Sequence, residues 1–355
     1  MDFDIEPLLR ENIKKLVPYS SARDEFKGEG KVFLDANENA FGSPLPISYN
    51  RYPDPLQWKL KERIAEIKGV PAPHIFIGNG SDEVIDIVFR AFCNPGVDNV
   101  VICPPTYGMY EVSANINDVE ARKVPLTPSF QLDLDKMEGV VDEHTKLIFI
   151  CSPNNPTGNA INRADIELLL NNFKGIVVID EAYINYSRHK SFIQELTEYP
   201  NLVVMQTLSK AWGLAALRVG MAFSSIPIID VMNKIKPPYN VNEASQQLAL
   251  QALGNVTQVN EWIRETVQER ERLALVFREI PVVTDVYPSD ANFLLVKTVD
   301  PRAIYTYLTE KGIIVRDRSK VELCAGCLRV TIGTPEENRE LVEAIREFAG
   351  HSLQC

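Results

Sequence analysis

The stretch T-L-S-K-A-W-G-L-A-A-L-R-V-G, residues 207 to 220, places a lysine and an arginine among small and apolar residues. Lysine is seldom buried without a partner, so the surroundings of Lys210 need an explanation. Burial would lower the pKa of its ammonium group and make a neutral, nucleophilic amine available. Such amines form Schiff bases with aldehydes, which makes Lys210 a candidate catalytic residue. A surface lysine on a loop is the more ordinary alternative.

Apolar runs on both sides of this stretch predict strands, and similar runs recur upstream. The predicted strands are 75–77, 100–103, 146–151, 176–180, 203–207 and 219–223. Amphipathic segments predict helices over 82–92, 163–172 and 192–197. Strands that alternate with helices indicate an α/β fold, with a mostly parallel sheet covered by helices on both faces.

The character of the sequence changes after Pro237-Pro238, where a charged helical pattern runs from Val256 to about Arg278. Strands are predicted over 282–286, 293–296, 313–315 and 328–332. A last helix, 336–348, has Pro335 in its first turn and Thr334 as its N-cap. We therefore expect a large domain over 51–240 and a smaller α+β domain over 241–355. Residues 1–50 are expected to form an arm and the first part of the small domain, with a strand at 32–35.

The composition limits the possible functions. The chain has 355 residues, enough for about two domains. Its net charge of -11 argues against a nucleic-acid partner, because phosphate backbones attract clustered Lys and Arg. No apolar run reaches the roughly 20 residues of a membrane span, and no signal-peptide pattern opens the sequence. Six scattered cysteines lack the density of a disulfide scaffold, so we expect a cytoplasmic protein.

Polar residues stand at three further strand ends. G-N-G-S-D-E (78–83) lies between a strand and a helix, where free N–H groups attract anions, although a plain glycine turn explains it at least as well. N-P-T-G (155–158) and D-E-A-Y (180–183) each follow an apolar strand, and turns or caps are the commoner roles there. The carboxyl ends of parallel strands are, however, where α/β proteins bind ligands.

Together, N-P-T-G, D-E-A-Y and S-K-x-x-x-L-x-x-x-R resemble the fold type I pyridoxal-phosphate enzymes of the aspartate aminotransferase superfamily, over nearly the whole chain. The resemblance implies a seven-stranded sheet and pyridoxal 5'-phosphate as cofactor. Lys210 would bind the cofactor as a Schiff base and later move a proton. Asp180 would keep the pyridine nitrogen protonated, which makes the ring an electron sink. Asn155 and Tyr183 would hydrogen-bond the phenolic oxygen, and Tyr107 would stack on the ring.

The same resemblance implies a phosphate site at the start of a helix. Its residues would be Gly80, Ser81, Asp82, Thr207, Ser209 and Arg218. The forked guanidinium of Arg218 suits a phosphate dianion. Tyr52, in R-Y-P-D-P, matches a tyrosine that reaches the phosphate from the neighbouring subunit, which implies a homodimer.

V-P-Y-S-S-A-R (17–23), L-D-A-N-E-N (34–39) and I-I-V-R-D with C-L-R-V-T-I-G-T resemble the histidinol-phosphate aminotransferases. That family transfers an amino group from L-histidinol phosphate to 2-oxoglutarate in histidine biosynthesis, giving imidazole acetol phosphate and L-glutamate. One anion pocket would bind the phosphate of one substrate and the carboxylate of the other. The residues implied around it are Tyr19, Asn37, Arg316 and Arg329. In the lysine loop, Ala216 stands where the family commonly has glycine. This departure from the family removes no group that takes part in the chemistry.

Other assignments stay open. Aromatic amino acid aminotransferases and L-threonine-O-phosphate decarboxylases share the fold. Transcription regulators with this fold carry an N-terminal helix-turn-helix module, a pattern that we do not find before residue 51. C-A-G-C (324–327) lacks the two further clustered ligands that zinc needs, so no metal site is predicted. A redox C-x-x-C would open a helix after a strand, whereas Cys327 leads into a predicted strand.

Overall fold

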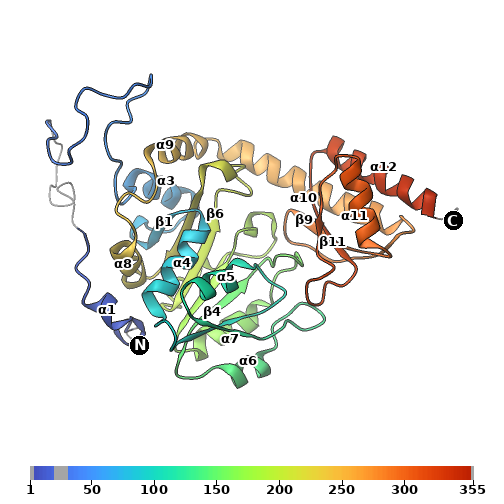
Figure 1. Cartoon of the computed structure of the whole chain (residues 1–355), viewed down its shortest axis with the longest axis horizontal. Coiled ribbons are helices and arrows are strands. Elements are labelled where there is room, and N and C mark those ends of the chain that lie inside the picture. Colours follow the sequence, from blue (N-terminus) through green and yellow to red (C-terminus); the bar gives the residue numbers. More distant parts are fainter. Residues whose placement is uncertain (1–3, 20–30, 353–355) are drawn as a thin grey trace. The chain divides into compact units, whose positions relative to one another are not determined.

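The structure is a computed structural model that describes residues 4–19 and 31–352 of the chain. Its larger sheet has seven strands in the order β1-β7-β6-β5-β4-β2-β3 (Figure 1). Their bounds are Ile75–Asn79 (β1), Asn99–Ile102 (β2), Glu120–Lys123 (β3), Thr145–Cys151 (β4), Ile176–Asp180 (β5), Leu202–Thr207 (β6) and Val219–Ser224 (β7). β4 pairs parallel with β2 and β5, and β7 pairs antiparallel with β1 and β6. The expected α/β fold is confirmed.

Most strands of this sheet are buried because helices cover its faces, while the edge strand β3 is partly exposed. Every residue of β2, β5, β6 and β7 is buried, which explains their continuous apolar runs. Helix α4 (Ser81–Phe92) packs on β1 and β7 and also contacts α8 (Ile226–Ile235) (Figure 1). The other helices along this part of the chain are α1 (Glu11–Lys14), α3 (Trp58–Lys68), α5 (Met109–Ile116), α6 (Leu134–Val140), α7 (Arg163–Asn172) and α9 (Glu243–Ala252).

The contacts between residues divide the chain into two compact units. The first unit comprises Met1–Asp98, Ser113–Glu120 and Phe192–Val256, and the second comprises Asn99–Val112, Ala121–Ser191 and Thr257–Cys355. The domain boundaries near residues 50 and 240 stay predictions.

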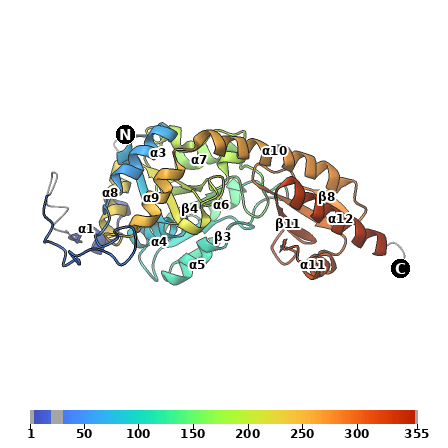
Figure 2. The ribbon, with the colours of Figure 1, turned by 90° about the horizontal axis from the view of Figure 1, so that it is seen from above.

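The second unit contains a smaller antiparallel sheet with the order β10-β11-β9-β8. Its elements are α10 (Val256–Arg278), β8 (Val283–Val286), β9 (Phe293–Thr298), α11 (Pro301–Glu310), β10 (Arg316–Asp317), β11 (Cys327–Thr331) and α12 (Pro335–Ser352) (Figure 2). Phe277, Leu308 and Leu328 are among the apolar side chains that join the helices to the sheet. Thr334 caps α12 as expected: its Oγ1 accepts from the Glu337 amide at 3.3 Å, and Glu337 accepts from the Thr334 amide at 2.7 Å.

Some local expectations differ from the structure. Residues 32–35 form no strand, and the exposed fractions of Val32 and Leu34 are 75% and 85%. The predicted strand at 313–315 is absent, and the short strand β10 begins directly after it at Arg316. Over 192–197 the helix is a 3-10 helix, Phe192–Glu195. Strand β3 was missed because its sequence, E-A-R-K, contains no apolar run.

A buried cation on α3 leads to a prediction about stability. Lys61 is 2% exposed, and burial, followed by the nearby charge of Lys236, lowers the pKa of its ammonium group from 10.5 to about 8. Below pH 8 the group is charged in both the folded and the unfolded chain, so its full desolvation cost opposes folding. Between pH 8 and 10.5 the unfolded chain binds more protons, and the free energy of unfolding rises with pH.

We therefore expect Lys61→Met to raise the free energy of unfolding at pH 7 by about 2 to 3 kcal/mol. The gain over wild type should shrink as the pH approaches 10. Urea unfolding at fixed protein concentration, repeated across this pH range, measures the difference. Exposed Lys59 on the same helix provides the control, and Lys59→Met should leave the curves unchanged. A gain that does not vary with pH would contradict the electrostatic explanation.

Candidate active site

The turn between β1 and α4 lies against the end of the lysine loop. A Cβ atom at Gly80 would lie 2.6 Å from Nη2 of Arg218, and one at Gly220 would lie 2.2 Å from the backbone nitrogen of Ser81. Gly80 also has a φ of 79°, which a side chain would strain. Only glycine at both positions allows the main chain and the arginine to approach so closely.

This approach brings together several of the residues expected at the phosphate. Arg218 Nη2 lies 3.2 Å from Asp82 Oδ2, in the first turn of α4, where backbone N–H groups have no partner within the helix. Thr207 pairs with Gly220 across β6 and β7, and its Oγ1 accepts from the Ser209 amide at 3.0 Å. The first unit therefore gathers these residues around one helix start.

Lys210 itself is exposed, although the sequence places it among apolar neighbours. Leu208 and Trp212 are buried at 1% and 7% exposure, so these apolar side chains of the loop pack inward. The lowered pKa expected for Lys210 stays a prediction.

Asp180 ends β5 in the second unit and is 4% exposed. Its Oδ2 accepts from the hydroxyl of Tyr110 at 2.7 Å, and its Oδ1 accepts from the backbone nitrogen of Ala182 at 3.0 Å. Burial, and then the charge of Asp180, raise the pKa of Tyr110 well above its usual value, so the phenol stays protonated and donates. The sequence analysis missed Tyr110, which lies three residues after Tyr107 in the first turn of α5 and contacts the Tyr107 ring at 5.6 Å between centroids.

Tyr110→Phe removes this donor and leaves a buried carboxylate oxygen without its hydrogen bond. A hydrogen bond to a charged group contributes about 1.5–3 kcal/mol, so we expect kcat to fall by about 10- to 100-fold. Steady-state measurement of kcat tests this, because the sequence analysis expects Asp180 among the catalytic residues. An unchanged kcat with lowered stability would mean that Tyr110 has only a structural role.

Three side chains from separate elements of the second unit form one polar network. Asn155 Nδ2 donates to the Tyr183 hydroxyl at 3.5 Å, and Asn155 Oδ1 accepts from Nη1 of Arg329. The Phe293 ring lies 5.2 Å from the Tyr183 ring and 5.3 Å from the Arg329 guanidinium. Burial raises the pKa of Tyr183 and lowers that of Arg329. A residue expected at the substrate thus contacts one expected at the cofactor, a link that the sequence did not indicate.

The other residues expected at the substrate lie in both units. Arg316 is directly opposite Arg329 in the β10–β11 pair. Asn37 and Tyr52 line a pocket of about 500 Å³ in the first unit, where Tyr52 stacks on Tyr239 at 4.5 Å. Tyr19 is 74% exposed. Residues 20–23 of V-P-Y-S-S-A-R lie outside the described residues.

Neither cysteine of C-A-G-C is poised for reaction. Cys324 and Cys327 are fully buried, and burial raises the pKa of their thiols to about 12 and about 11, respectively. Cys327 begins β11, as the sequence indicated. Within residues 4–19 and 31–352, no group of three or more His, Cys, Asp or Glu side chains could hold a metal ion. None of the helices in those ranges has the length and apolar character to cross a membrane.

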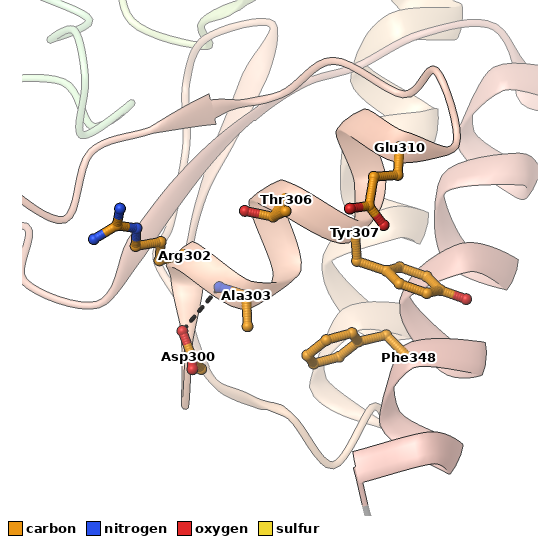
Figure 3. A pocket seen from close by; sticks show the side chains of 7 residues that line it. All are labelled: Asp300, Arg302, Ala303, Thr306, Tyr307, Glu310 and Phe348. Carbon is orange, nitrogen blue, oxygen red and sulfur yellow. Dashed lines mark hydrogen bonds between the residues drawn. The ribbon is translucent and has the colours of Figure 1, made fainter.

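A separate pocket of about 490 Å³ lies beside α11 (Figure 3). Tyr307 and Phe348 form its apolar side, with ring centroids 5.4 Å apart, and Arg302 and Glu310 come from α11. None of the residues that the sequence analysis selected lines it.

The chain belongs to the class I and II aminotransferases, whose family model matches residues 45–345. Several relatives narrow this class to histidinol-phosphate aminotransferases. The enzyme of that name from Parabacteroides distasonis is 56% identical over 97% of this chain and 99% of its own length. The one from Cytophaga hutchinsonii is 53% identical over 98% of this chain and its own full length, 100%.

Solved structures agree on the fold. Histidinol-phosphate aminotransferase from Sinorhizobium meliloti, in complex with pyridoxal-5'-phosphate, superposes with a TM-score of 0.79 at 24% identity, covering 89% of this chain and 90% of its own. L-threonine-O-3-phosphate decarboxylase from Porphyromonas gingivalis gives 0.72 at 23% identity, covering 85% and 91%. Both the aminotransferase and the decarboxylase therefore have this fold, so the fold alone does not distinguish between the two activities.

Proposed function

We propose that the chain transfers the amino group of L-histidinol phosphate to 2-oxoglutarate, giving imidazole acetol phosphate and L-glutamate, as a step of histidine biosynthesis. The observation that carries this proposal is the pairing of Arg316 with Arg329. Like charges directly opposite each other on a sheet destabilise it, so this pair is suited to an anion that lies between the two side chains. The identity to enzymes of this name over almost the full chain supports the choice of substrate.

The residues present fit pyridoxal 5'-phosphate as cofactor. The glycines at 80 and 220 and the guanidinium of Arg218 make a main-chain cradle suited to a phosphate. Asp180 is buried and accepts hydrogen bonds from the Tyr110 hydroxyl and the Ala182 amide, which fix the carboxyl group in place. It would be the residue that holds the pyridine nitrogen. When bound, the cofactor supplies the electron sink for the reaction.

The side chains then have distinct tasks. Lys210 would hold the cofactor through its aldehyde, and its amine would be the group that moves the proton of the substrate carbon. Asn155 and Tyr183 would hold the phenolic oxygen, and the hydrogen bond between them would keep both side chains directed to one point. Tyr107 would contact the face of the ring. Because Arg329 also donates to Asn155, the group that binds the substrate anion helps to orient a group that binds the cofactor.

The N-terminal arm supports a homodimer. Its apolar side chains include Val17, Leu34 and Phe41, which are exposed at 84%, 85% and 103%. Apolar surface of this kind marks an interaction site, and we assign it to a second copy of this chain in the cytoplasm. Tyr52 would reach the phosphate of the neighbouring subunit. Sedimentation of the purified protein tests the dimer, and a monomer at micromolar concentration would overturn it.

The function is tested by the absorbance of the bound cofactor. L-histidinol phosphate should convert the cofactor to its amine form, and 2-oxoglutarate should restore the starting spectrum, with ping-pong kinetics in the steady state. A much faster conversion by L-phenylalanine would identify an aromatic aminotransferase. Release of carbon dioxide from L-threonine O-phosphate without any keto acid would identify a decarboxylase.

A further inference from the structure

A third arginine shares the face on which Arg316 and Arg329 lie. Asp317 pairs with Leu328, and the Arg318 amide donates to the Cys327 carbonyl at 2.9 Å, so the β10–β11 register continues one residue past the end of β10. Alternate residues of a strand point to the same face, which places the Arg318 side chain beside that of Arg316. Asp317 points to the opposite face, where its Oδ1 accepts from the amide and hydroxyl of Ser319 at 2.8 and 2.6 Å.

The three guanidinium groups act on one another without a carboxylate between them. Burial lowers the pKa of Arg318, and the charges of Arg329 and Arg316 lower it further, whereas Cys324 and Tyr183 oppose this effect. Among the residues that the structure describes, no Asp or Glu forms an ion pair with any of the three. The Arg318 Nε is buried and donates to no acceptor there. Three cations with an unused donor on one face are suited to an anion of more than one charge.

We propose that Arg318 is the third cation of the substrate pocket and favours a phosphate monoester over a carboxylate. A phosphate monoester carries about −1.5 to −2 charges at pH 7 and three strong acceptor oxygens, whereas a carboxylate carries one charge and two oxygens. Arg316 and Arg329 suffice for the carboxylate of glutamate. Arg318 adds a hydrogen-bond donor that only the phosphate uses. It therefore strengthens the binding of L-histidinol phosphate but not that of glutamate in the same pocket. This inference rests on the proposed function.

The test compares Arg318→Gln with Arg302→Gln, an exposed arginine of α11 outside the site. In Arg318→Gln we expect the KM for L-histidinol phosphate to rise by about 10- to 100-fold, the factor for one charge-assisted hydrogen bond. The KM for L-glutamate in the reverse reaction should change by less than about threefold, because its carboxylate keeps both of its arginines. Arg302→Gln should match wild type in KM and kcat with both substrates.

The pH dependence separates a direct contact from a structural effect. The second pKa of a phosphate monoester is about 6, so the wild-type KM for L-histidinol phosphate should rise between pH 7.5 and 5.5. This rise should be clearly smaller in Arg318→Gln and partly restored in Arg318→Lys. Equal KM changes for both substrates, or an unaltered pH profile, would overturn the role of Arg318.

A further measurement does not depend on the proposed substrate. Inorganic phosphate should raise the Tm of the wild-type holoenzyme, whose cofactor site is already filled, and should raise that of Arg318→Gln much less. If the wild-type enzyme does not accept L-histidinol phosphate, the proposed function fails. A difference between the two phosphate titrations would still support Arg318 as a phosphate ligand, and identical titrations would refute it.

Discussion

Lys210→Ala is expected to lower kcat in both half-reactions by about 10⁴-fold or more, because a positioned acid–base group alone contributes up to that factor and covalent binding of the aldehyde is lost as well. The side chain is exposed, so its removal opens no cavity and the fold should be retained. Rapid-mixing absorbance measurements on L-histidinol phosphate and then on 2-oxoglutarate give the two rates.

The control for this variant is Lys174→Ala, which removes an exposed lysine next to β5. It should show wild-type rates. Added methylamine should restore part of the activity of Lys210→Ala, because a free amine can replace the missing base. Full activity without added amine would disprove the assignment of Lys210, and a lowered Tm would point to misfolding instead.

Asp180→Asn is expected to reduce kcat by about 10²- to 10³-fold, the cost typical of removing one preorganised electrostatic group. The substitution keeps the size of the side chain. The amide oxygen can still accept from the Ala182 amide, and the Tyr110 hydroxyl can rotate to accept from the amide nitrogen, so mainly the negative charge is lost. Asp180 is 4% exposed, which prevents water or salt from replacing that charge. Both half-reactions should slow by similar factors, since both depend on a protonated ring.

Exposed Asp135 on α6 provides the matched control, and Asp135→Asn should leave kcat unchanged. Cofactor content and Tm distinguish catalysis from binding in Asp180→Asn. A variant that retains cofactor and Tm but turns over at the wild-type rate would show that the ring needs no partner at this carboxylate.

Where burial is strong, the fold follows from sequence patterns. The bounds of β5, α7 and α10 match the apolar and amphipathic patterns to the residue. Patterns failed where apolar side chains are exposed, as at Val32 and Leu34, because the alternation that marks a half-buried strand can also occur in an exposed segment. The patterns also failed at β3, because this strand is formed by polar residues and has no apolar run to mark it.

Only those residues of the candidate site that lie in recognisable sequence motifs could be predicted. Lys210, Asp180 and Asn155 stand in recognisable loops, whereas Tyr110 contacts Asp180 across 70 residues of sequence, and no local pattern encodes such a contact. Arg318 could not be assigned from the sequence, because the strand was expected over 313–315 and the register that places Arg318 beside Arg316 follows only from β10.

The contact between Gly220 and the main chain at Ser81 has a consequence for how this protein can evolve. A side chain at residue 220 would meet main-chain atoms, which cannot rotate out of the way as side-chain atoms can. Strands β10 and β11 are joined by main-chain pairing, so a substitution at Arg316 or Arg329 can change the charge while the backbone stays in register. Changes to the proposed anion pocket can therefore leave the backbone intact, whereas a side chain at position 80 or 220 would disrupt the main-chain cradle.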